Sequence, residues 1–225
     1  GDAARAKAVV QNEILASAAM YDAIHAEDPN HLILGVKQIT QLTPPELLEA
    51  AAPYVDVFSI DDYTLVGDLD RQIPAAWPWY LPRDPTFANL YARLHKPLMV
   101  MEYSFRAADA GVPNSYPPIY PTYPDQAART AATADYLRRM YSLPYVVGDH
   151  WFEYVDEPAG GRFDGEDSNF GLVTAADVPW ATLVGSMTAL HRDEQPDRVA
   201  DPDPPCWSYG RDARGRVRCV EAPRR

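Results

Sequence analysis

The sequence predicts an α/β fold with a parallel sheet, organised as part of a (β/α)8 barrel. Short apolar runs of strand length alternate with segments of helical periodicity, which is typical of parallel sheets. The long loops all follow a strand rather than a helix. A complete barrel has eight such units in about 250 residues, whereas only about four are found in this chain of 225 residues.

Five segments have helical patterns. Residues 4–27 place apolar side chains at intervals of three and four residues. A second helix is expected to start at Thr43, an N-cap residue followed by proline and, three positions on, by Glu46. The expected helices cover residues 4–27, 43–52, 86–95, 125–141 and 179–191.

Four apolar runs are expected to form strands, at residues 31–36, 55–60, 97–102 and 145–152. The third ends abruptly in the carboxylate of Glu102. In an α/β barrel, the carboxyl ends of the strands form the rim where active sites are built. Position alone leaves two interpretations open for Glu102, an active-site residue or the point where a strand leaves the core for water.

Composition excludes several classes of function. The 47% hydrophobic content predicts a globular chain, and the net charge of -12 argues against a nucleic-acid partner. No run approaches the ~18 apolar residues of a membrane span.

Neither a metal nor another cofactor is expected, because the histidines have no ligand spacing. The segment 164–169 resembles the opening of a calcium loop without its terminal glutamate, which favours a substrate-binding loop.

The chain divides into a main domain, residues 1–193, and a Pro/Asp-rich tail, residues 194–225, expected to be loosely ordered. Cys206 and Cys219 both lie in the tail and suit either one hairpin-closing disulfide or two free thiols. The disulfide would favour secretion. The start at Gly1, without methionine or a signal peptide, suggests a piece of a longer or processed protein.

Aromatic side chains are concentrated in the loops that follow the predicted strands. Trp77 and Trp79 lie in a loop of about twenty residues, and Trp151 ends the fourth strand. Long loops are usually functional, and flat aromatic faces stack on the apolar faces of sugar rings. These residues therefore predict a carbohydrate cleft, although each single tryptophan would also suit packing of the loop onto the barrel.

Several segments resemble the C-terminal half of a clan A retaining glycoside hydrolase, closest to the β-agarase and β-galactosidase-like branches. The resemblance covers roughly residues 5–191. It rests on Asp28 to Gly35, Tyr54 to Val57, Pro97 to Phe105, His150 to Tyr154, and Asp164 to Val173.

This resemblance implies that the four strands are strands 5–8 of a barrel and that Glu102 is the catalytic nucleophile. It further implies that Trp151 lines the sugar site and that Tyr63 lies beside the nucleophile. Glu153, Glu166 and Asn169 complete the expected substrate-binding set.

The catalytic acid/base is not identified. Clan A enzymes carry it after the fourth strand as Asn-Glu, but Asn12-Glu13 lies inside a predicted helix. Substitutes within the chain are Glu153, Asp61 and Asp62. The leading hypothesis is therefore a glycosidase of a β-linked polysaccharide whose acid is supplied from outside this chain, by a missing N-terminal half-barrel. The alternatives are a non-catalytic carbohydrate-binding fragment, and a half-barrel that closes its sheet by self-association.

Overall fold

The computed structural model divides the chain into two compact units. The first contains residues 1–62, 79–101 and 204–225, and the second contains residues 63–78 and 102–203. The structure describes residues 2–39, 43, 45–63, 87–116, 120, 122–194, 208–211 and 217–221.

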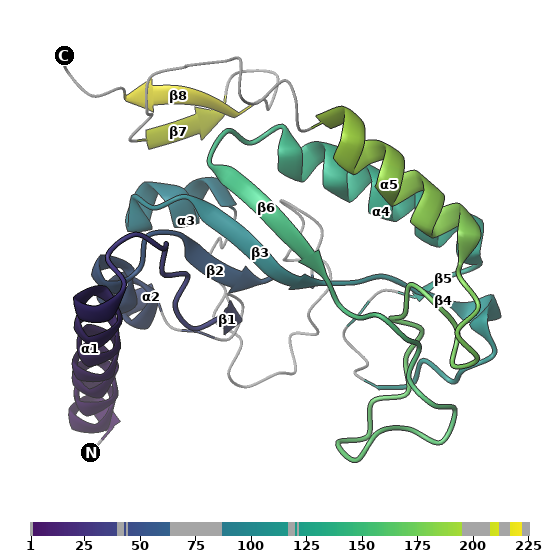
Figure 1. Cartoon of the computed structure of the whole chain (residues 1–225), viewed down its shortest axis with the longest axis horizontal. Coiled ribbons are helices and arrows are strands. Elements are labelled where there is room, and N and C mark those ends of the chain that lie inside the picture. The colour runs from purple at the N-terminus through teal and green to yellow at the C-terminus, as the bar shows by residue number, and fades with distance from the viewer. Residues whose placement is uncertain are drawn as a thin grey trace. The chain divides into compact units, whose positions relative to one another are not determined.

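The main sheet has four strands, in the order β1-β2-β3-β6 (Figure 1). Strands β1 and β2 pair in parallel, with Gln38 opposite Ile60 and Ile39 opposite Asp61. The predicted α/β class with parallel strands is confirmed. The strands of this sheet are β1 (Gln38–Ile39), β2 (Phe58–Asp61), β3 (Leu98–Tyr103) and β6 (Val146–Trp151).

The first expected strand is wrong in its position. Residues 31–36 form no strand, and β1 begins only at Gln38. The backbone of Ile33 is bonded to Asp56, whose amide donates to the Ile33 carbonyl over 2.8 Å. Gly35 then takes a φ of +70°, which a strand residue does not adopt, and a Cβ there would lie 2.4 Å from Val55 Cγ1. The chain therefore turns at the glycine before it enters the sheet.

The helices lie close to their expected positions. The longest, α1, starts and ends near the predicted limits, and the third, α3, differs by one residue at each end. In α4, the Asp125 side chain caps the helix by accepting from the Ala128 amide at 2.7 Å. The helices are α1 (Asp2–Glu27), α2 (Pro45–Ala51), η1 (Ala52–Tyr54), α3 (Phe87–Leu94), η3 (Ala108–Ala110), α4 (Gln126–Tyr141) and α5 (Ala181–Glu194).

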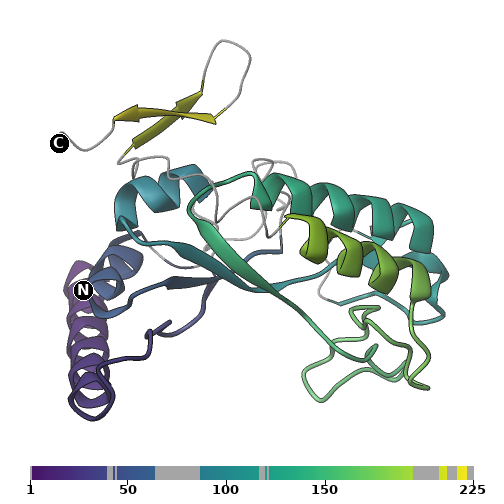
Figure 2. The same ribbon diagram turned by 45° about the horizontal axis from the view of Figure 1, so that its top comes forward.

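In the second unit, α4 and α5 lie side by side and cover one face of β6 (Figures 1 and 2). Tyr103 at the end of β3 is fully buried, and its ring stacks on Tyr136 of α4 with centroids 5.0 Å apart. Two loops follow the strands of this unit. Residues 104–125 come after β3 and contain the parallel pair of β4 (Arg106–Ala107) and β5 (Thr122–Tyr123), and residues 152–180 come after β6.

The tail contains an antiparallel pair, β7 (Ser208–Arg211) and β8 (Val217–Glu221), in which Tyr209 lies opposite Cys219. Cys206 lies outside the described residues, so the disulfide stays a prediction. Among the helices that the structure describes, none is long and apolar enough to cross a membrane.

Candidate active site

Glu102 is the penultimate residue of β3 and is partly buried. The hydroxyl of Tyr63 donates to Glu102 Oε2 at 2.7 Å. A hydrogen bond to an ionised carboxylate is stronger than one between neutral groups. Tyr63 therefore fixes the orientation of the carboxylate, and the two predicted site residues lie together.

Three aromatic rings pack around Tyr63, and we call the four rings together the aromatic wall: Tyr63, Tyr120, Phe152 and Phe170. Tyr63 stacks on Tyr120, with centroids 4.4 Å apart and planes at 17°. Phe152 meets Tyr63 edge-on at 6.3 Å, and Phe170 lies 5.8 Å from Phe152 and 5.7 Å from Tyr120. Tyr63 is thus held on several sides, so its hydroxyl is fixed toward Glu102.

Trp151 belongs to the opposite face of the sheet. Its ring lies 5.3 Å from that of Tyr103, in a T-shaped contact, and the indole nitrogen donates to the Phe170 carbonyl at 2.7 Å. Because successive side chains of a strand point to opposite faces, Glu102 and Tyr103 point away from each other. Trp151 therefore packs on the helix side, and Phe152 is the neighbouring aromatic residue on the side of Glu102.

The helix side of the strand ends holds a buried polar cluster around Asp149. Its carboxylate accepts from Tyr103 Oη at 2.7 Å and from the Tyr141 hydroxyl, and His191 Nε2 lies 3.1 Å away. Burial raises the pKa of Asp149, but the bonds from His191, Tyr141 and Tyr103 outweigh it and leave that pKa lowered. The bond with Asp149 in turn raises the pKa of His191.

Arg129 of α4 is fully buried beneath the two loops. It donates to the Phe105 carbonyl at 2.7 Å and to the Gly171 carbonyl at 2.9 Å, and its guanidinium lies 5.5 Å from the Trp151 ring centroid. Burial lowers the pKa of Arg129 to about 10, so it stays charged at neutral pH. One cation thus joins α4 to both loops, a role that no motif in the sequence indicates.

Asn169 is completely buried, and protein groups bond its side chain on every side. Its Oδ1 accepts from the Ala107 amide at 3.2 Å and from Gln126 Nε2 at 2.9 Å, while Nδ2 donates to Asp156 Oδ1 at 2.6 Å. Its backbone amide donates to Asn114 Oδ1 at 2.7 Å. We call these residues the Asn169 network, and it joins the loop after β3 to the loop after β6.

The two residues before Asn169 extend the same connection. Asp167 accepts from the amides of Ser115 and Tyr116 at 2.7 and 2.9 Å. Ser168 donates through its hydroxyl to the Tyr116 carbonyl at 2.7 Å and accepts from Arg106 Nη1 at 3.0 Å. The segment that looked like a calcium-loop opening is therefore tied into the protein by its own side chains.

Arg162 lies among four carboxylates in the loop after β6. Its nitrogens approach Asp164 at 2.6 Å, Glu166 at 2.8 Å, Glu157 at 3.4 Å and Glu153 at 3.9 Å. Its guanidinium also lies 5.9 Å from the Phe152 ring centroid, which connects these charges to the aromatic wall.

Two of these carboxyl groups hold protons more tightly than usual. The Glu157 side chain is only 1% exposed. Burial, reinforced by its hydrogen bond with Glu166, raises the pKa of Glu157 to about 8. Burial also raises the pKa of Glu153. At neutral pH the loop therefore carries less negative charge than its sequence suggests.

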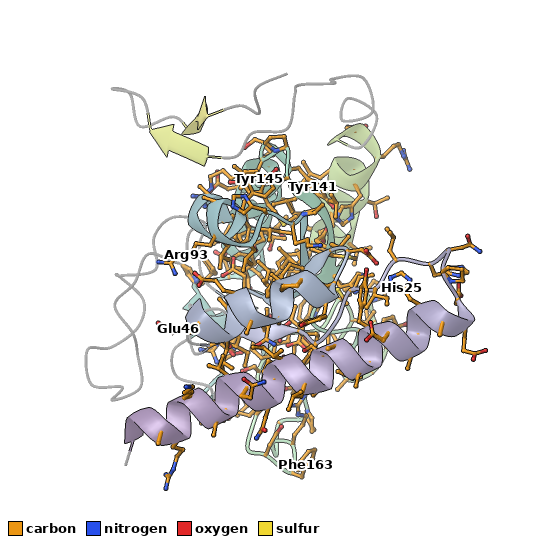
Figure 3. All side chains as sticks on the ribbon, turned by 90° about the vertical axis from the view of Figure 1, so that its left-hand side faces the viewer. His25, Glu46, Arg93, Tyr141, Tyr145 and Phe163 are labelled. Carbon is orange, nitrogen blue, oxygen red and sulfur yellow. The ribbon has the colours of Figure 1, made fainter. Side chains whose placement is uncertain are left out.

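The tip of the same loop carries a fully exposed ring, that of Phe163, which Figure 3 shows at its outer end. The flanking residues are held by a bond from the Gly165 amide to the Arg162 carbonyl at 3.0 Å. The Arg162 amide bonds the Glu166 carbonyl at 2.7 Å.

The remaining sequence candidates are placed as follows. Trp77 and Trp79 lie outside the described residues. Asp61 and Asp62 are buried, at 5% and 3% exposure. Glu13 lies within α1, where it accepts from Ser17 Oγ at 3.1 Å. Within the part of the chain that the structure describes, no group of three acidic, histidine or cysteine side chains is arranged to hold a metal ion.

Comparison with known proteins identifies similar chains. β-Agarase B of Vibrio sp. (strain JT0107) is 32% identical over 166 residues, which is 73% of this chain and 16% of the relative. β-Agarase A of the same strain is 28% identical over 204 residues, 90% of this chain and 18% of the relative. The crystal structure of an agarase, AgWH50C, matches with a TM-score of 0.68 and 29% identity over 83% of this chain and 24% of that chain.

No family model matches the chain. The chain spans less than a fifth of the length of the curated relatives that it matches. These similarities establish homology to a segment of the β-agarases and support a glycoside hydrolase.

Proposed function

We propose that this chain belongs to a retaining glycoside hydrolase that cleaves β-linked galactans of the agar type, with Glu102 as its nucleophile. The single observation that carries the proposal is the position of Glu102. It lies at the end of a strand, where the hydroxyl of Tyr63, a member of the aromatic wall, donates to it. Homology to β-agarases indicates the substrate class.

In this mechanism the Glu102 carboxylate attacks the anomeric carbon and forms a glycosyl-enzyme intermediate, which water then hydrolyses. The bond from Tyr63 orients the Glu102 carboxylate for this attack. Phe152 and Tyr120 supply apolar surface on which a sugar ring stacks. The wall is partly buried, which limits access of water to the nucleophile.

We assign two roles that differ from direct substrate contact. Trp151 supports the sheet from the helix side through Tyr103 and the Phe170 carbonyl, rather than forming the floor of the sugar site. Asn169 is fully buried and bonded to protein groups, so it shapes the loops instead of touching the sugar. Glu153 and Glu166 keep their expected role of bonding sugar hydroxyls; both pair with Arg162, whose guanidinium lies 5.9 Å from the Phe152 ring centroid, and this supports the assignment.

A retaining enzyme needs a second carboxyl group ~5–5.5 Å from the nucleophile to protonate the leaving oxygen. We propose that this acid comes from the part of the protein that lies outside this chain. The secreted location expected from the tail cysteines belongs to the same proposal, because a polymeric substrate must be reached outside the cell.

The second candidate function is carbohydrate binding without catalysis. The placement of Glu13 favours it, since the only Asn-Glu pair of the chain lies in the middle of α1 and not at a strand end. Under this alternative the aromatic wall would bind a polysaccharide that is not cleaved.

The two functions are separated by Glu102→Gln in the intact protein. We expect kcat/KM on agarose oligosaccharides and aryl β-galactosides to fall by at least ~10³-fold, because the nucleophile is lost. Glu27→Gln, at an exposed position of α1, is the matched control and should keep full activity. Undiminished hydrolysis by Glu102→Gln would overturn the mechanism, whereas binding without hydrolysis in the wild-type protein would favour the second function.

A further inference from the structure

The loops after β3 and after β6 both carry residues of the proposed site. Tyr120 lies in the first loop, and Phe152 and Phe170 lie in the second. A sugar stacked on Tyr120 and Phe152 is held correctly only if the two loops keep a fixed separation. The following inference rests on the proposed function and concerns what fixes that separation.

The Asn169 network is one of the links between these loops, beside the bonds of Asp167 and Ser168 to the Ser115–Tyr116 segment. One amide side chain accepts from Ala107 and Gln126 and donates to Asp156, while its own backbone amide donates to Asn114. In turn Asn114 Nδ2 donates to the Ala107 carbonyl at 2.9 Å. Asn169 thus bonds the first loop at two points, directly at the Ala107 amide and at the Asn114 side chain, which itself holds the Ala107 carbonyl.

The network is completed on the side of the second loop. Asp156 Oδ1 also accepts from the Gly171 amide at 2.8 Å, and its Oδ2 accepts from Trp180 Nε1 at 2.9 Å. A Cβ at Gly171 would lie 2.1 Å from the Asp156 amide nitrogen, so the chain packs here without space for any side chain. Buried polar networks that are fully bonded rigidify the structure around them.

The network lies next to the aromatic wall in the sequence and in space. Phe170 follows Asn169 directly, is fully buried, and is a member of the wall. On the first loop, Arg106 precedes the bonded amide of Ala107 and donates to the Tyr120 carbonyl at 2.5 Å. A displacement of Asn169 therefore moves Phe170 on one side and Tyr120 on the other.

We infer that Asn169 is a positioning residue that sets the width of the sugar-binding site by joining the two loops that form it. It acts through Phe170 and Tyr120 and makes no contact with the substrate. This role differs from that of a stabilising core residue, because its loss changes substrate handling at temperatures where the protein is fully folded.

The test compares Asn169→Ala with Thr133→Ala in the intact protein. Thr133 is also buried in the second unit, but its hydroxyl donates within α4, to the Arg129 carbonyl at 2.9 Å. Well below both melting temperatures, we expect Asn169→Ala to lower kcat/KM on agarose oligosaccharides by ~10–100-fold, since a misplacement of about 1 Å has effects of that size. Thr133→Ala should lower the melting temperature and leave kcat/KM unchanged.

A second measurement needs no activity. Amide hydrogen exchange within residues 104–116 should accelerate in Asn169→Ala and not in Thr133→Ala, because the Ala107 amide loses its acceptor on the Asn169 side chain. Gln126→Ala removes only one bond of the network and serves if Asn169→Ala does not fold; it should shift both measurements in the same direction by less.

Unchanged exchange at residues 104–116, or a kcat/KM equal to that of Thr133→Ala, would overturn the inference. The exchange measurement remains informative if Glu102→Gln is fully active. Failure of the proposed function and failure of this inference are therefore distinguishable.

Discussion

Glu102 and Tyr103 are consecutive residues of one strand, yet their side chains lie in contrasting environments. Glu102 is partly accessible and bonded to one tyrosine in an aromatic wall. Tyr103 is fully buried and belongs to a cluster of Asp149, Tyr141 and His191 between the sheet and two helices. Both sides use a carboxylate held by tyrosine hydroxyls, but only one of them leaves the carboxylate within reach of a ligand.

The contrast shows that a carboxylate bonded by a tyrosine hydroxyl has a different role when it is buried than when it is partly exposed. A carboxylate buried on all sides is satisfied by protein donors, and its function is to hold β6 against the helices. The carboxylate of Glu102 lies instead at a partly exposed position. The alternation of side chains along a strand is sufficient to separate the two roles by a single residue.

The largest effect is expected when the buried carboxylate, that of Asp149, is removed. In Asp149→Ala, the hydroxyls of Tyr103 and Tyr141 and the ring of His191 lose their shared acceptor inside the protein. Because unpaired buried groups are costly, we expect the free energy of unfolding to fall by ~3–5 kcal/mol. The measurement is urea denaturation, and activity below the melting temperature should be retained. A stability equal to wild type would contradict the support role.

The open side is tested by Tyr63→Phe, which keeps the ring of the aromatic wall and removes only its hydroxyl. A hydrogen bond to a charged group contributes ~1.5–3 kcal/mol, so we expect kcat/KM in the intact protein to fall by ~10–100-fold. Stability should change little, because the ring contacts with Tyr120 and Phe152 remain. Tyr123→Phe, in β5, is the control. If Tyr63→Phe lost much stability and kept full activity, the Glu102 side of the sheet would have the supporting role assigned here to the Asp149 side.

The smallest expected effect is a dependence of stability on pH that comes from His191. Its pKa is raised by the hydrogen bond with Asp149. The pair therefore stabilises the fold fully below the unfolded-state pKa of about 6.5, and this contribution is lost as pH rises through the folded-state pKa. The difference in unfolding free energy between wild type and His191→Asn should be largest at mildly acidic pH and should shrink as pH rises.

The groups that face this imidazole are Asp149 and the ring of Tyr141, which lies 6.0 Å away. In the Tyr141→Phe background the pH dependence should persist, since the carboxylate remains. A difference that grows with pH would show that His191 is neutral in the folded protein.

Much of the fold follows from sequence patterns. Helical sequence patterns predict α1 and α4 nearly to their ends. The apolar run ending in Glu102 predicts β3. The first strand is misplaced because a run of apolar residues does not reveal that Gly35 has a positive φ, which depends on the close approach of Val55.

Less of the candidate active site could be predicted from sequence patterns. The pairing of Tyr63 with Glu102 was expected from the resemblance to a known family, and it brings together residues 39 positions apart. Whether Trp151 or Phe152 lines the proposed site depends on which of them lies on the same side of the sheet as Glu102. The sequence does not show this, because it does not give the register between β3 and β6. Arg129 carries no sequence signal, because its importance lies in the distant backbone groups that it bonds. Asn169 was expected to bind substrate, and the sequence does not reveal that its side chain is bonded to distant protein groups instead.

The turn that presents Phe163 has a practical consequence for protein engineering. Its two ends are closed by the bond between the Arg162 amide and the Glu166 carbonyl, so the residues between them add nothing to the core. Lengthening a surface loop with closed ends costs little chain entropy. This turn is therefore the natural position at which to insert a fluorescent tag or an affinity peptide without disturbing the sheet beneath.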